Sequence, residues 1–492
     1  MPPTRGLIMW NPTSAAIALG LDVDVVRDYD ASGSTLTTRG SMTAGSPTLT
    51  LASPLDFRNG QGIAVEGAGP DGQLLVTTII GGGGTAVLTL AAPAGSAVTD
   101  ALIQHDDSQA WQAAIDAASA PTVISCPPGL TMNIAAPLLL KSDVAIAFPA
   151  ATLRWIGPQG GTIFTSPVSV PLVRSAILGG QVDPSGAGRV VDLHSPRGCT
   201  FDLDVTDGSP TLTVMRWTGG SGNVVRRLTA GTCGTLLALA GQADDEIAFN
   251  AFQHLAGADC HVGGVICEPS GHVTTNTFLS THLTLNADNT VGVDLGQSDA
   301  APAISNLVFA ALCIENPKAK NCTGLSLHRA AQVQVLAYRH TGFPPGTAVN
   351  GGQSASYYIR DTGDGSTATI ADGTRGWSVT PLKVGPGGAP VTGHLSSFQL
   401  IQPVAVPPQA GISTSATIPG ARPGDAVVAT PADVVPPGLA WNAGVISDGV
   451  VALYLANPTQ APLAIGPIHW RFSIWQYQNE GSDTRCPTTP SP

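Results

Sequence analysis

Short strand-like segments recur through the middle of the chain every 24 to 30 residues, and this repeat limits the possible folds more than any other feature. Each repeat contains a three-residue segment at its start, and these segments cover residues 199–201, 223–225, 250–252, 276–278, 306–308 and 331–333. A second short strand precedes each of them, at residues 190–193, 212–217, 236–239, 262–266, 291–295 and 323–327. Two strands per repeat, joined by polar turns, predict one coil of a solenoid.

Such short strands cannot bury a core alone, but stacked coils can. Successive coils in register, about 4.8 Å apart, would satisfy one another's backbone hydrogen bonds and enclose one continuous interior. Asn223, Asn250, Asn276 and Asn306 each begin a repeat. Because stacked asparagine side chains hydrogen-bond to one another, we expect these residues to form a ladder that supports the fold and carries no chemistry.

The composition favours β-structure with a neutral surface. Only 11% of the 492 residues are charged, against about 25% in an average soluble domain. Glycine and proline number 58 and 40, which is too many for a helix bundle or a coiled coil. The formal net charge of −12 leaves no basic face for a phosphate backbone, so nucleic acid is not an expected partner. A neutral, hydroxylated ligand suits this surface better.

The sequence also predicts no membrane partner, no cofactor and no metal. No apolar run approaches the roughly 18 residues that a membrane helix needs, and Asn11 and Pro12 interrupt the apolar start, which makes it a poor signal-peptide core. The eight cysteines show neither a C-x-x-C pair nor zinc spacing, so we expect them to be reduced and mostly buried. No repeated calcium motif accompanies the carboxylates.

A helix is expected upstream of the repeats. Residues 105–118 place Ala110, Trp111, Ala114 and Ile115 on one stripe at helical spacing, with Asp106 and Asp107 at the positive N-terminus. The following segment, 122–129, reads as a strand and a turn. This order is what a helix capping the open end of a solenoid would require.

These residues carry a resemblance to a known superfamily. The stretches 25–33, Asp106-Asp107 with the alanine-rich helix, and 123–129 together resemble the opening of the pectate-lyase-like right-handed parallel β-helix superfamily, which includes many bacteriophage tailspikes. In that superfamily the first strand runs almost directly into the helix, whereas here about 70 residues intervene. The intervening segment reads as a small antiparallel β-domain, an insertion similar to those of phage-type members.

We therefore predict an all-β chain: a right-handed, single-stranded parallel β-helix with an N-terminal capping helix, an inserted small β-domain and a C-terminal β-sandwich. The sandwich is expected because strands with turn signals replace the repeat from about residue 392. The predicted boundaries are an N-terminal segment at 1–24, the β-helix at 25–33 and 105–391, the insertion at 34–104, the sandwich at 392–480 and a tail at 481–492.

Acidic residues gather in the turns that follow the first strand of successive repeats. Equivalent turns of neighbouring coils lie about 5 Å apart, a spacing that suits the paired carboxylates of glycosidases. One carboxyl would protonate the glycosidic oxygen and another would act as base or nucleophile. The candidate catalytic residues are Asp244, Asp245, Glu246 and Glu268. The candidate substrate-binding residues are His272, Asp299, His328, Arg329 and Trp217. Ordinary polarity of solvated turns is the alternative.

A second line of polar residues follows the second strands, and it suits a lyase, which needs a basic residue beside a neutralised uronate. The line contains Asp204, Asp207, Asp259, His261, Asp288, Glu315, Lys318, Lys320, Arg339 and His340. Ordinary loop polarity explains it equally well. His254 and His282 lie within strands and read as structural, and five aromatic residues are candidates for sugar stacking or for the core: Trp217, Tyr338, Phe343, Tyr357 and Tyr358.

The resemblance implies a phage tailspike or receptor-binding protein, a homotrimer that binds a bacterial surface polysaccharide and depolymerises it. Its place would be the virion tail or the extracellular space, with residues 1–24 attached to the baseplate or tail. Two alternatives remain open: a bacterial extracellular polysaccharide lyase or glycoside hydrolase, and a non-catalytic tail fibre or adhesin. The sequence alone does not separate hydrolysis from elimination.

Overall fold

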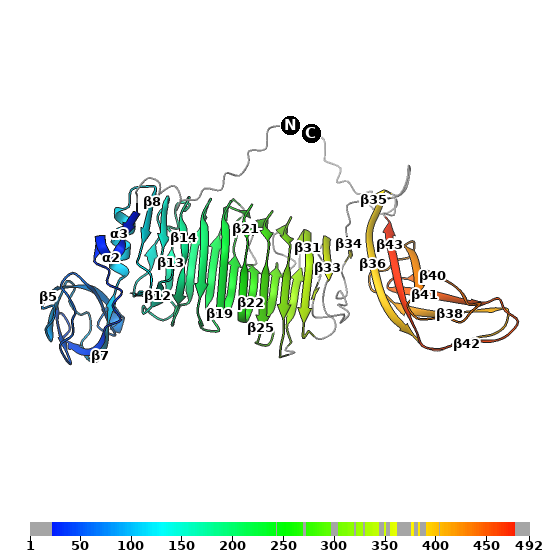
Figure 1. Ribbon diagram of the computed structural model, residues 1–492, viewed down its shortest axis with the longest axis horizontal. Helices are drawn as coiled ribbons and strands as arrows, with labels where there is room; N and C mark the ends of the chain where they lie inside the picture. The colour runs from blue at the N-terminus through cyan, green and yellow to red at the C-terminus, as the bar shows by residue number, and fades with distance from the viewer. Residues whose placement is uncertain are drawn as a thin grey trace, which may run out of the picture.

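The computed structural model describes residues 22–242, 244–268, 272–296, 304–318, 321–327, 330–343, 349–350, 355–361, 375–377, 382–383, 390–402 and 404–477. A small barrel, a parallel β-solenoid of about eight turns and a group of antiparallel sheets follow one another along the long axis (Figure 1). Strand accounts for 55% of the chain and helix for 5%, so the expected all-β class is confirmed. No helix in the described ranges is long and apolar enough to span a membrane.

The segment expected to hold an antiparallel β-domain closes into a six-stranded barrel. Its strands pair in the order β2-β3-β6-β5-β4-β7, all antiparallel. They are β2 (Thr37–Met42), β3 (Thr48–Leu51), β4 (Gly62–Val65), β5 (Leu75–Gly81), β6 (Val87–Leu90) and β7 (Val98–Asp106), with one 3-10 turn, η1 (Pro70–Gly72). Leu49, Ile63 and Ile103 fill its interior, because alternate residues of each strand point inward.

Two helices cover the end of the solenoid next to the barrel. Helix α3 (Ser108–Ala117) buries Trp111, Ala114 and Ile115 against the solenoid core, as its apolar stripe predicts. The preceding segment, which resembles the superfamily's first strand, differs from the expectation. Only β1 (Asp22–Asp24) is a strand, and the next residues form a short helix, α2 (Val25–Tyr29), because Asp24 accepts hydrogen bonds from the backbone of Val26 and Arg27 as an N-cap.

Three parallel sheets and a corner form the wall of the solenoid. Sheet 1 contains β1, β8 (Thr122–Ser125), β11 (Val144–Ala147), β14 (Ala176–Asp183), β16 (Thr200–Val205), β19 (Val224–Leu239), β21 (Ala251–Phe252), β24 (Thr277–Phe278), β28 (Val308–Phe309), β31 (Ala330–Thr341) and β33 (Ala355–Asp361). Long strands such as β19 bend and continue into the neighbouring sheets.

Sheet 2 adds β9 (Thr131–Ile134), β12 (Thr152–Trp155), β22 (Leu255–Cys267), β25 (Thr281–Leu285) and β29 (Leu312–Glu315) to parts of β14, β16, β19 and β31. Sheet 3 combines the ends of β19 and β22 with β10 (Leu138–Leu139), β13 (Thr162–Thr165), β15 (Arg189–His194), β17 (Thr213–Thr218), β26 (Val291–Leu295), β30 (Thr323–Leu327) and β32 (Val349–Asn350).

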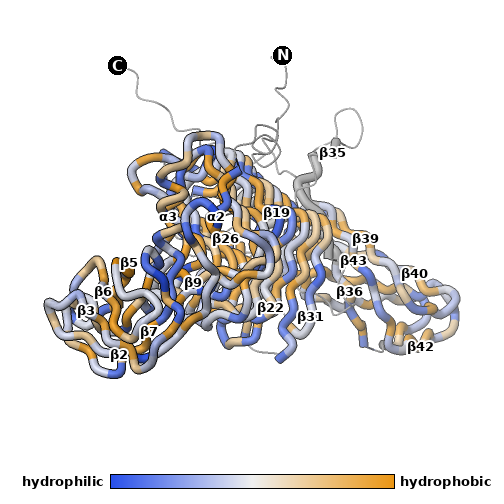
Figure 2. Tube along the Cα trace, turned by 60° about the vertical axis from the view of Figure 1, so that its left-hand side comes forward, coloured by the Kyte–Doolittle hydropathy of each residue, from blue (hydrophilic) through white to orange (hydrophobic). Residues whose placement is uncertain are grey.

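The corner between sheets 3 and 1 contains the short strands β18 (Gly220–Ser221), β20 (Ile247–Ala248), β23 (Val273–Thr274) and β27 (Ile304–Ser305), and β34 (Arg375–Trp377) pairs with β33. Hydrophobic segments recur coil after coil along the solenoid (Figure 2). Inside, Phe252, Phe278 and Phe309 stack, with ring centroids 4.5 and 4.3 Å apart. The predicted columns of side chains are therefore present.

The asparagine ladder is real but one residue shorter than predicted. Asn223 Nδ2 donates to Asn250 Oδ1, and Asn250 Nδ2 donates to Asn276 Oδ1, both at 2.9 Å. The register then places Leu307, not Asn306, at the next rung, since Thr277 pairs with Val308. Asn306 instead takes the preceding left-handed position, with φ of 56°. The last repeat likewise begins at Val333 rather than Ala331, because Val308 pairs with Gln334.

Antiparallel sheets follow the solenoid, in agreement with the predicted C-terminal β-domain. One sheet has the order β35-β36-β43-β39, another β38-β41-β40, and β37 pairs with β42. Their bounds are β35 (Leu382–Lys383), β36 (Pro390–Ile401), β37 (Val404–Val406), β38 (Ala410–Thr417), β39 (Ala426–Pro431), β40 (Ala440–Ser447), β41 (Val450–Asn457), β42 (Leu463–Ile465) and β43 (Ile468–Tyr477). Val451, Leu453 and Phe472 form a core separate from that of the solenoid.

Candidate functional site

The predicted catalytic acids lie on two stacked turns at the corner between sheets 3 and 1. The first turn joins β19 to β20 and the second joins β22 to β23. The two turns hydrogen-bond to each other, because the backbone N–H of His272 donates to Gly241 at 3.1 Å and that of Ile247 donates to His272 at 2.9 Å. Glu246 and Glu268 are therefore on neighbouring coils, but at opposite ends of their turns, because Glu246 precedes the pair Ile247–Val273 and Glu268 follows the pair Leu239–Cys267.

Glu268 is held by an arginine two coils away. Arg216 Nε donates to Oε1 at 2.8 Å and Nη2 donates to Oε2 at 3.0 Å, so both carboxylate oxygens are engaged. Arg216 Nη1 also lies 3.5 Å from Asp192 Oδ1. The intervening coil presents Ala238 beside Arg216, and this small side chain lets the guanidinium reach across. The hydrogen bond from Arg216 to Glu268 raises the pKa of Arg216.

The other three predicted acids differ in how they are engaged. Asp245 Oδ1 accepts from Arg197 Nη2 at 3.0 Å. Asp245 packs over Gly219, where any Cβ would collide with its carboxylate. Glu246 is exposed and accepts from Thr274 at 3.1 Å, and Asp244 is exposed. The corner therefore holds ordered ion pairs at Asp245 and Glu268, and Asp244 and Glu246 are the two predicted acids that face no arginine in the contacts described.

The predicted binding residues divide into three groups. Trp217 is fully buried and packs between Phe201 and Phe252, so the idea that it stacks on a sugar is wrong: its side chain points into the core from β17. His272 lies in the second corner turn, half-buried, where its backbone links the coils. The remaining three, Asp299, His328 and Arg329, lie outside the described residues.

The second predicted line is spread over the outer face of sheet 2 and the turns beyond it. His261 Nε2 lies 3.2 Å from Asp259 Oδ2, and His282 Nε2 lies 3.5 Å from Glu315 Oε1. His340 is buried instead, beside the equally buried Tyr338, so neither is available to a surface ligand. The stretch with Lys320 lies outside the described residues, and so do the side chains of Tyr357 and Tyr358.

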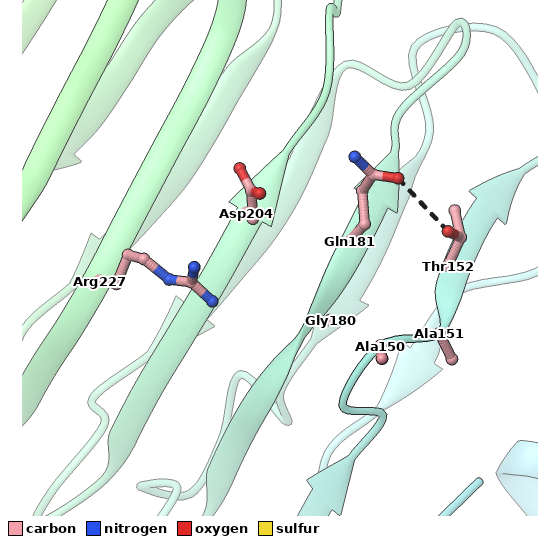
Figure 3. A pocket seen from close by; sticks show the side chains of 7 residues that line it. All are labelled: Ala150, Ala151, Thr152, Gly180, Gln181, Asp204 and Arg227. Carbon is pink, nitrogen blue, oxygen red and sulfur yellow. Dashed lines mark hydrogen bonds between the residues drawn. The ribbon is translucent and has the colours of Figure 1, made fainter. Parts of the chain in front are cut away.

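An open pocket of about 290 Å³ occupies the outer face of sheet 2 and includes one residue of that line, Asp204. Its polar side chains come from four successive strands, β12, β14, β16 and β19, and its lining is Ala150, Ala151, Thr152, Gly180, Gln181, Asp204 and Arg227. Gln181 lies between Thr152 and Asp204, and Arg227 reaches toward Asp204 from the next strand (Figure 3).

Contacts within the sheet order these side chains. The Thr152 hydroxyl donates to Gln181 Oε1 at 3.4 Å, and the Thr229 hydroxyl donates to Asp204 Oδ1 at 2.5 Å. Arg227 Nε donates to Asp202 Oδ1 at 2.9 Å. Gly180, with φ of 95°, bends β14 where a Cβ would strike Phe148. The pocket therefore presents a row of amide, carboxylate and guanidinium groups on the outer face of sheet 2.

Three of these residues, Thr152, Gln181 and Arg227, were missed from the sequence. A signal existed, because charged and polar residues alternate with buried ones in β12, β16 and β19. A sheet covered by water on its outer face produces the same alternation, so the pattern does not single out a site. The bulge in β14, which brings Gln181 into register with Asp204, is visible only in the structure.

The fold and these surfaces define a class: a parallel β-solenoid protein with a barrel at one end, antiparallel sheets at the other, and a polar pocket on the outer face of sheet 2. No protein-family model matches the sequence, and no curated protein matches it. Solved structures of phage tailspikes do show similarity. The tailspike of Pseudomonas phage LKA1 is 11% identical with a TM-score of 0.28, covering 90% of this chain and 82% of that one.

Two further solved structures belong to the same kind of protein. The tailspike of E. coli bacteriophage HK620, in complex with a pentasaccharide, is 13% identical with a TM-score of 0.33, over 75% of this chain and 90% of that one. The Dettilon tailspike is 9% identical with a TM-score of 0.32, over the same shares. These identities and TM-scores are low, so the function is argued below from this chain's own residues.

Proposed function

We propose that this protein binds a bacterial surface polysaccharide along the outer face of sheet 2, as a tailspike-type receptor-binding protein. The observation that carries the proposal is the pocket of about 290 Å³ lined by Thr152, Gln181, Asp204 and Arg227. That volume lies near the lower end of the range for small-molecule sites, which suits one short stretch of a longer ligand.

The chemistry of the pocket supports a sugar over other ligands. Amide, carboxylate, hydroxyl and guanidinium groups offer both donors and acceptors, which is what the vicinal hydroxyls of a saccharide require. Strand spacing sets these groups about 4.8 Å apart along the solenoid, so an extended chain can meet several in turn. No aromatic residue lines the pocket, and hydrogen bonding would therefore carry the recognition.

Cleavage remains part of the proposal, with Glu246, an exposed acid at the corner that no described arginine engages, as its candidate catalytic residue. The pocket and the corner lie on different walls of the solenoid, so a chain that binds at one does not reach the other in the same coil. Binding without cleavage, as in a tail fibre or adhesin, is accordingly the second candidate function.

A binding assay with purified bacterial capsular and O-antigen polysaccharides tests the first proposal. Arg227→Ala should weaken the binding of the recognised polysaccharide at least about tenfold and Gln181→Ala by about two- to tenfold, since a hydrogen bond is worth about 1.5 to 3 kcal/mol when one group is charged and about 0.5 to 1.5 kcal/mol when both are neutral. Arg174→Ala is the matched control, because Arg174, 51% exposed against 44% for Arg227, is an arginine paired with Asp143 away from the pocket. If neither variant weakens binding, the pocket is not the polysaccharide-binding site.

Incubating the protein with the polysaccharide that it binds then tests for cleavage. New reducing ends indicate hydrolysis and new unsaturated uronate absorbance indicates elimination, and Glu246→Gln should abolish either one. Glu268→Gln tests whether the arginine-paired acid takes part. If cleavage is seen and neither variant alters it, the corner is not the catalytic site; if binding occurs with no cleavage, the binder function stands alone.

The proposal includes a homotrimer attached to a virion tail. Light scattering of the intact chain should then give three times the 49.8 kDa of one chain. Antibodies raised against the chain should decorate the tails of phage particles from the same source. A mass of 49.8 kDa in solution, or undecorated tails, would remove the corresponding part of the proposal.

A further inference from the structure

Three side chains with metal-ligating atoms meet on the outer face of sheet 2, starting two coils beyond the last strand of the pocket. His282 is on β25, and Cys313 and Glu315 are on β29. His282 and Cys313 are direct register partners on neighbouring coils. Glu315 follows Cys313 by two positions, so its side chain emerges on the same face. The strand ladder therefore sets the three residues beside one another without a loop.

The distances between the donor atoms are short enough for all three to bind one metal ion. The donor atoms of the three residues all lie within 4.8 Å of one another. His282 Nε2 and Glu315 Oε1 are 3.5 Å apart. In a tetrahedral zinc site, bonds of about 2.1 Å to nitrogen and oxygen place two ligand atoms about 3.4 Å apart. The histidine–glutamate pair already has that spacing, and only the cysteine side chain has to move closer.

The donor set is selective. A thiolate, an imidazole and a carboxylate together suit Zn²⁺ and Co²⁺, whereas Ca²⁺ and Mg²⁺ prefer oxygen ligands alone. Among the seven cysteines of the described ranges, Cys313 is the one that is not buried. His282 is 51% exposed and Glu315 38% exposed at the side chain, so an ion can reach all three donors.

The surroundings are small or neutral side chains, with one arginine nearby. The register partner of His282 on the preceding coil is Ala256, and Glu315 is flanked by the neutral Thr284 and Thr341. Arg339 is the partner of Cys313 on the next coil and adds one positive charge. With a metal ion bound, Cys313 would be a thiolate, and the thiolate and the Glu315 carboxylate would supply two negative charges to a divalent cation.

We propose that His282, Cys313 and Glu315 form a binding site for a single zinc ion, which links two neighbouring coils of the solenoid. Three protein ligands leave the fourth tetrahedral position for water, the arrangement of an open rather than a closed zinc site. The proposal is independent of polysaccharide binding, because it uses none of the residues of the pocket or the corner.

Titration of the full chain with Co²⁺, followed by competition with Zn²⁺, tests the site. The expected result is one Co²⁺ per chain, with a sulfur-to-cobalt charge-transfer band and the intense visible bands of tetrahedral Co²⁺, both of which Zn²⁺ removes. Cys313→Ser should abolish the charge-transfer band. His282→Gln and Glu315→Gln should each weaken the affinity at least about tenfold, as even the loss of groups that only orient ligands does.

Two controls separate this site from adventitious binding. Cys486 lies outside the described residues, so the titration is repeated in a Cys486→Ser background and should not change. His261→Gln is the matched variant, because His261 also pairs with a carboxylate, Asp259, at 3.2 Å but has no thiol in that pair. It should leave the cobalt spectrum as it is.

A thermal shift provides a second readout. Zn²⁺ should raise the unfolding temperature of the wild type, since an ion that binds only the folded state stabilises it by mass action. Cys313→Ser should fold with the same circular dichroism spectrum and show no zinc-dependent shift. A wild-type spectrum without sulfur-to-cobalt charge transfer, or a Cys313→Ser protein with unchanged cobalt spectrum and zinc shift, would overturn the proposal.

Discussion

Individual buried polar residues hold the junction between the barrel and the solenoid. His105 and Asp107 are each 1% exposed, with His105 Nδ1 3.6 Å from Asp107 Oδ2. The backbone N–H of Ser32 donates to Asp107 Oδ1 at 2.9 Å, and the Ser32 hydroxyl lies 2.9 Å from His105 Nε2. Burial raises the pKa of Asp107 to about 7 and lowers that of His105 to about 4. The folded state therefore favours the uncharged forms of both.

The raised pKa of Asp107 gives a pH dependence with a definite sign. An unfolded Asp107 ionises above about 3.8 and the folded one above about 7, so its contribution to stability is complete below the first value and is lost as the pH rises to the second. Asp107→Asn removes this loss. Relative to the wild type, the variant should gain about 1.4 kcal/mol of unfolding free energy per pH unit between about pH 4 and 7.

Urea unfolding of both proteins at several pH values measures this difference. Asp116→Asn, on the exposed side of helix α3, is the control and should track the wild type. A constant difference between Asp107→Asn and the wild type across the range would show that Asp107 ionises normally in the folded state.

The asparagine ladder makes a second prediction for single residues. Asn250 is 2% exposed, accepts from the side chain of Asn223 and donates to that of Asn276. Asn250→Ala removes the oxygen that accepts from both the backbone N–H and the side-chain amide of Asn223, at about 1 to 3 kcal/mol for each buried donor, whereas Asn276 Oδ1 still accepts from the backbone N–H of residue 250. We expect a loss of about 2 to 5 kcal/mol in unfolding free energy, measured by urea denaturation. Asn442→Ala, at an exposed position of β40, should change it by less than about 0.5 kcal/mol.

At the scale of elements, a column of stacked phenylalanine rings packs the strands of sheet 1 against one another. Phe252, Phe278 and Phe309 stack with interplanar angles of 8° and 9°, since parallel strands in register repeat the same side-chain direction at every coil. Phe278→Ala opens a cavity between two rings that cannot collapse without shifting the strands. We expect it to cost about 3 to 5 kcal/mol of unfolding free energy.

The neighbouring residue supplies the matched control for this column. Leu279 is next in sequence but 45% exposed, so Leu279→Ala removes apolar atoms without leaving a cavity. Its cost should stay within about 0.5 kcal/mol. Equal destabilisation by the two variants, measured by the same denaturant titration, would contradict a buried stack.

At the scale of the whole molecule, the barrel, the solenoid and the C-terminal sheets each have a hydrophobic core of their own among the described residues. Separate cores predict more than one unfolding transition in calorimetry, because each part can lose its packing without exposing the others. Ile63→Ala, in the barrel core, should lower one transition by the equivalent of about 2 to 5 kcal/mol and leave the others in place. A single transition that shifts as a whole would mean that the parts unfold together.

The solenoid itself could be predicted from the sequence, and most of its outer surface could not. Inward residues such as Phe201, Phe252 and Phe278 recur at a spacing that a reader can count. The sequence also predicted that the corner acids lie on neighbouring coils, because turns of successive coils stack. Their ion pairs were not predictable: Glu268 binds Arg216, which lies 52 positions earlier and reaches across Ala238 on the coil between them. Trp217 was misjudged because one residue's shift in a strand reverses the direction of its side chain.

The amino-acid sequence by itself determined that the chain coils, since alternation within each strand and turn residues between strands are local properties. Only the tertiary structure decided the register: Thr274 pairs with Ser305 and Thr277 with Val308, so Leu307, not Asn306, lies opposite Asn276 in the ladder. Register in turn decides which outward side chains meet, and so it created the pocket around Gln181 and Asp204 and the cluster of His282, Cys313 and Glu315. Those neighbours are distant in sequence, and hydrogen bonds between whole strands bring them together.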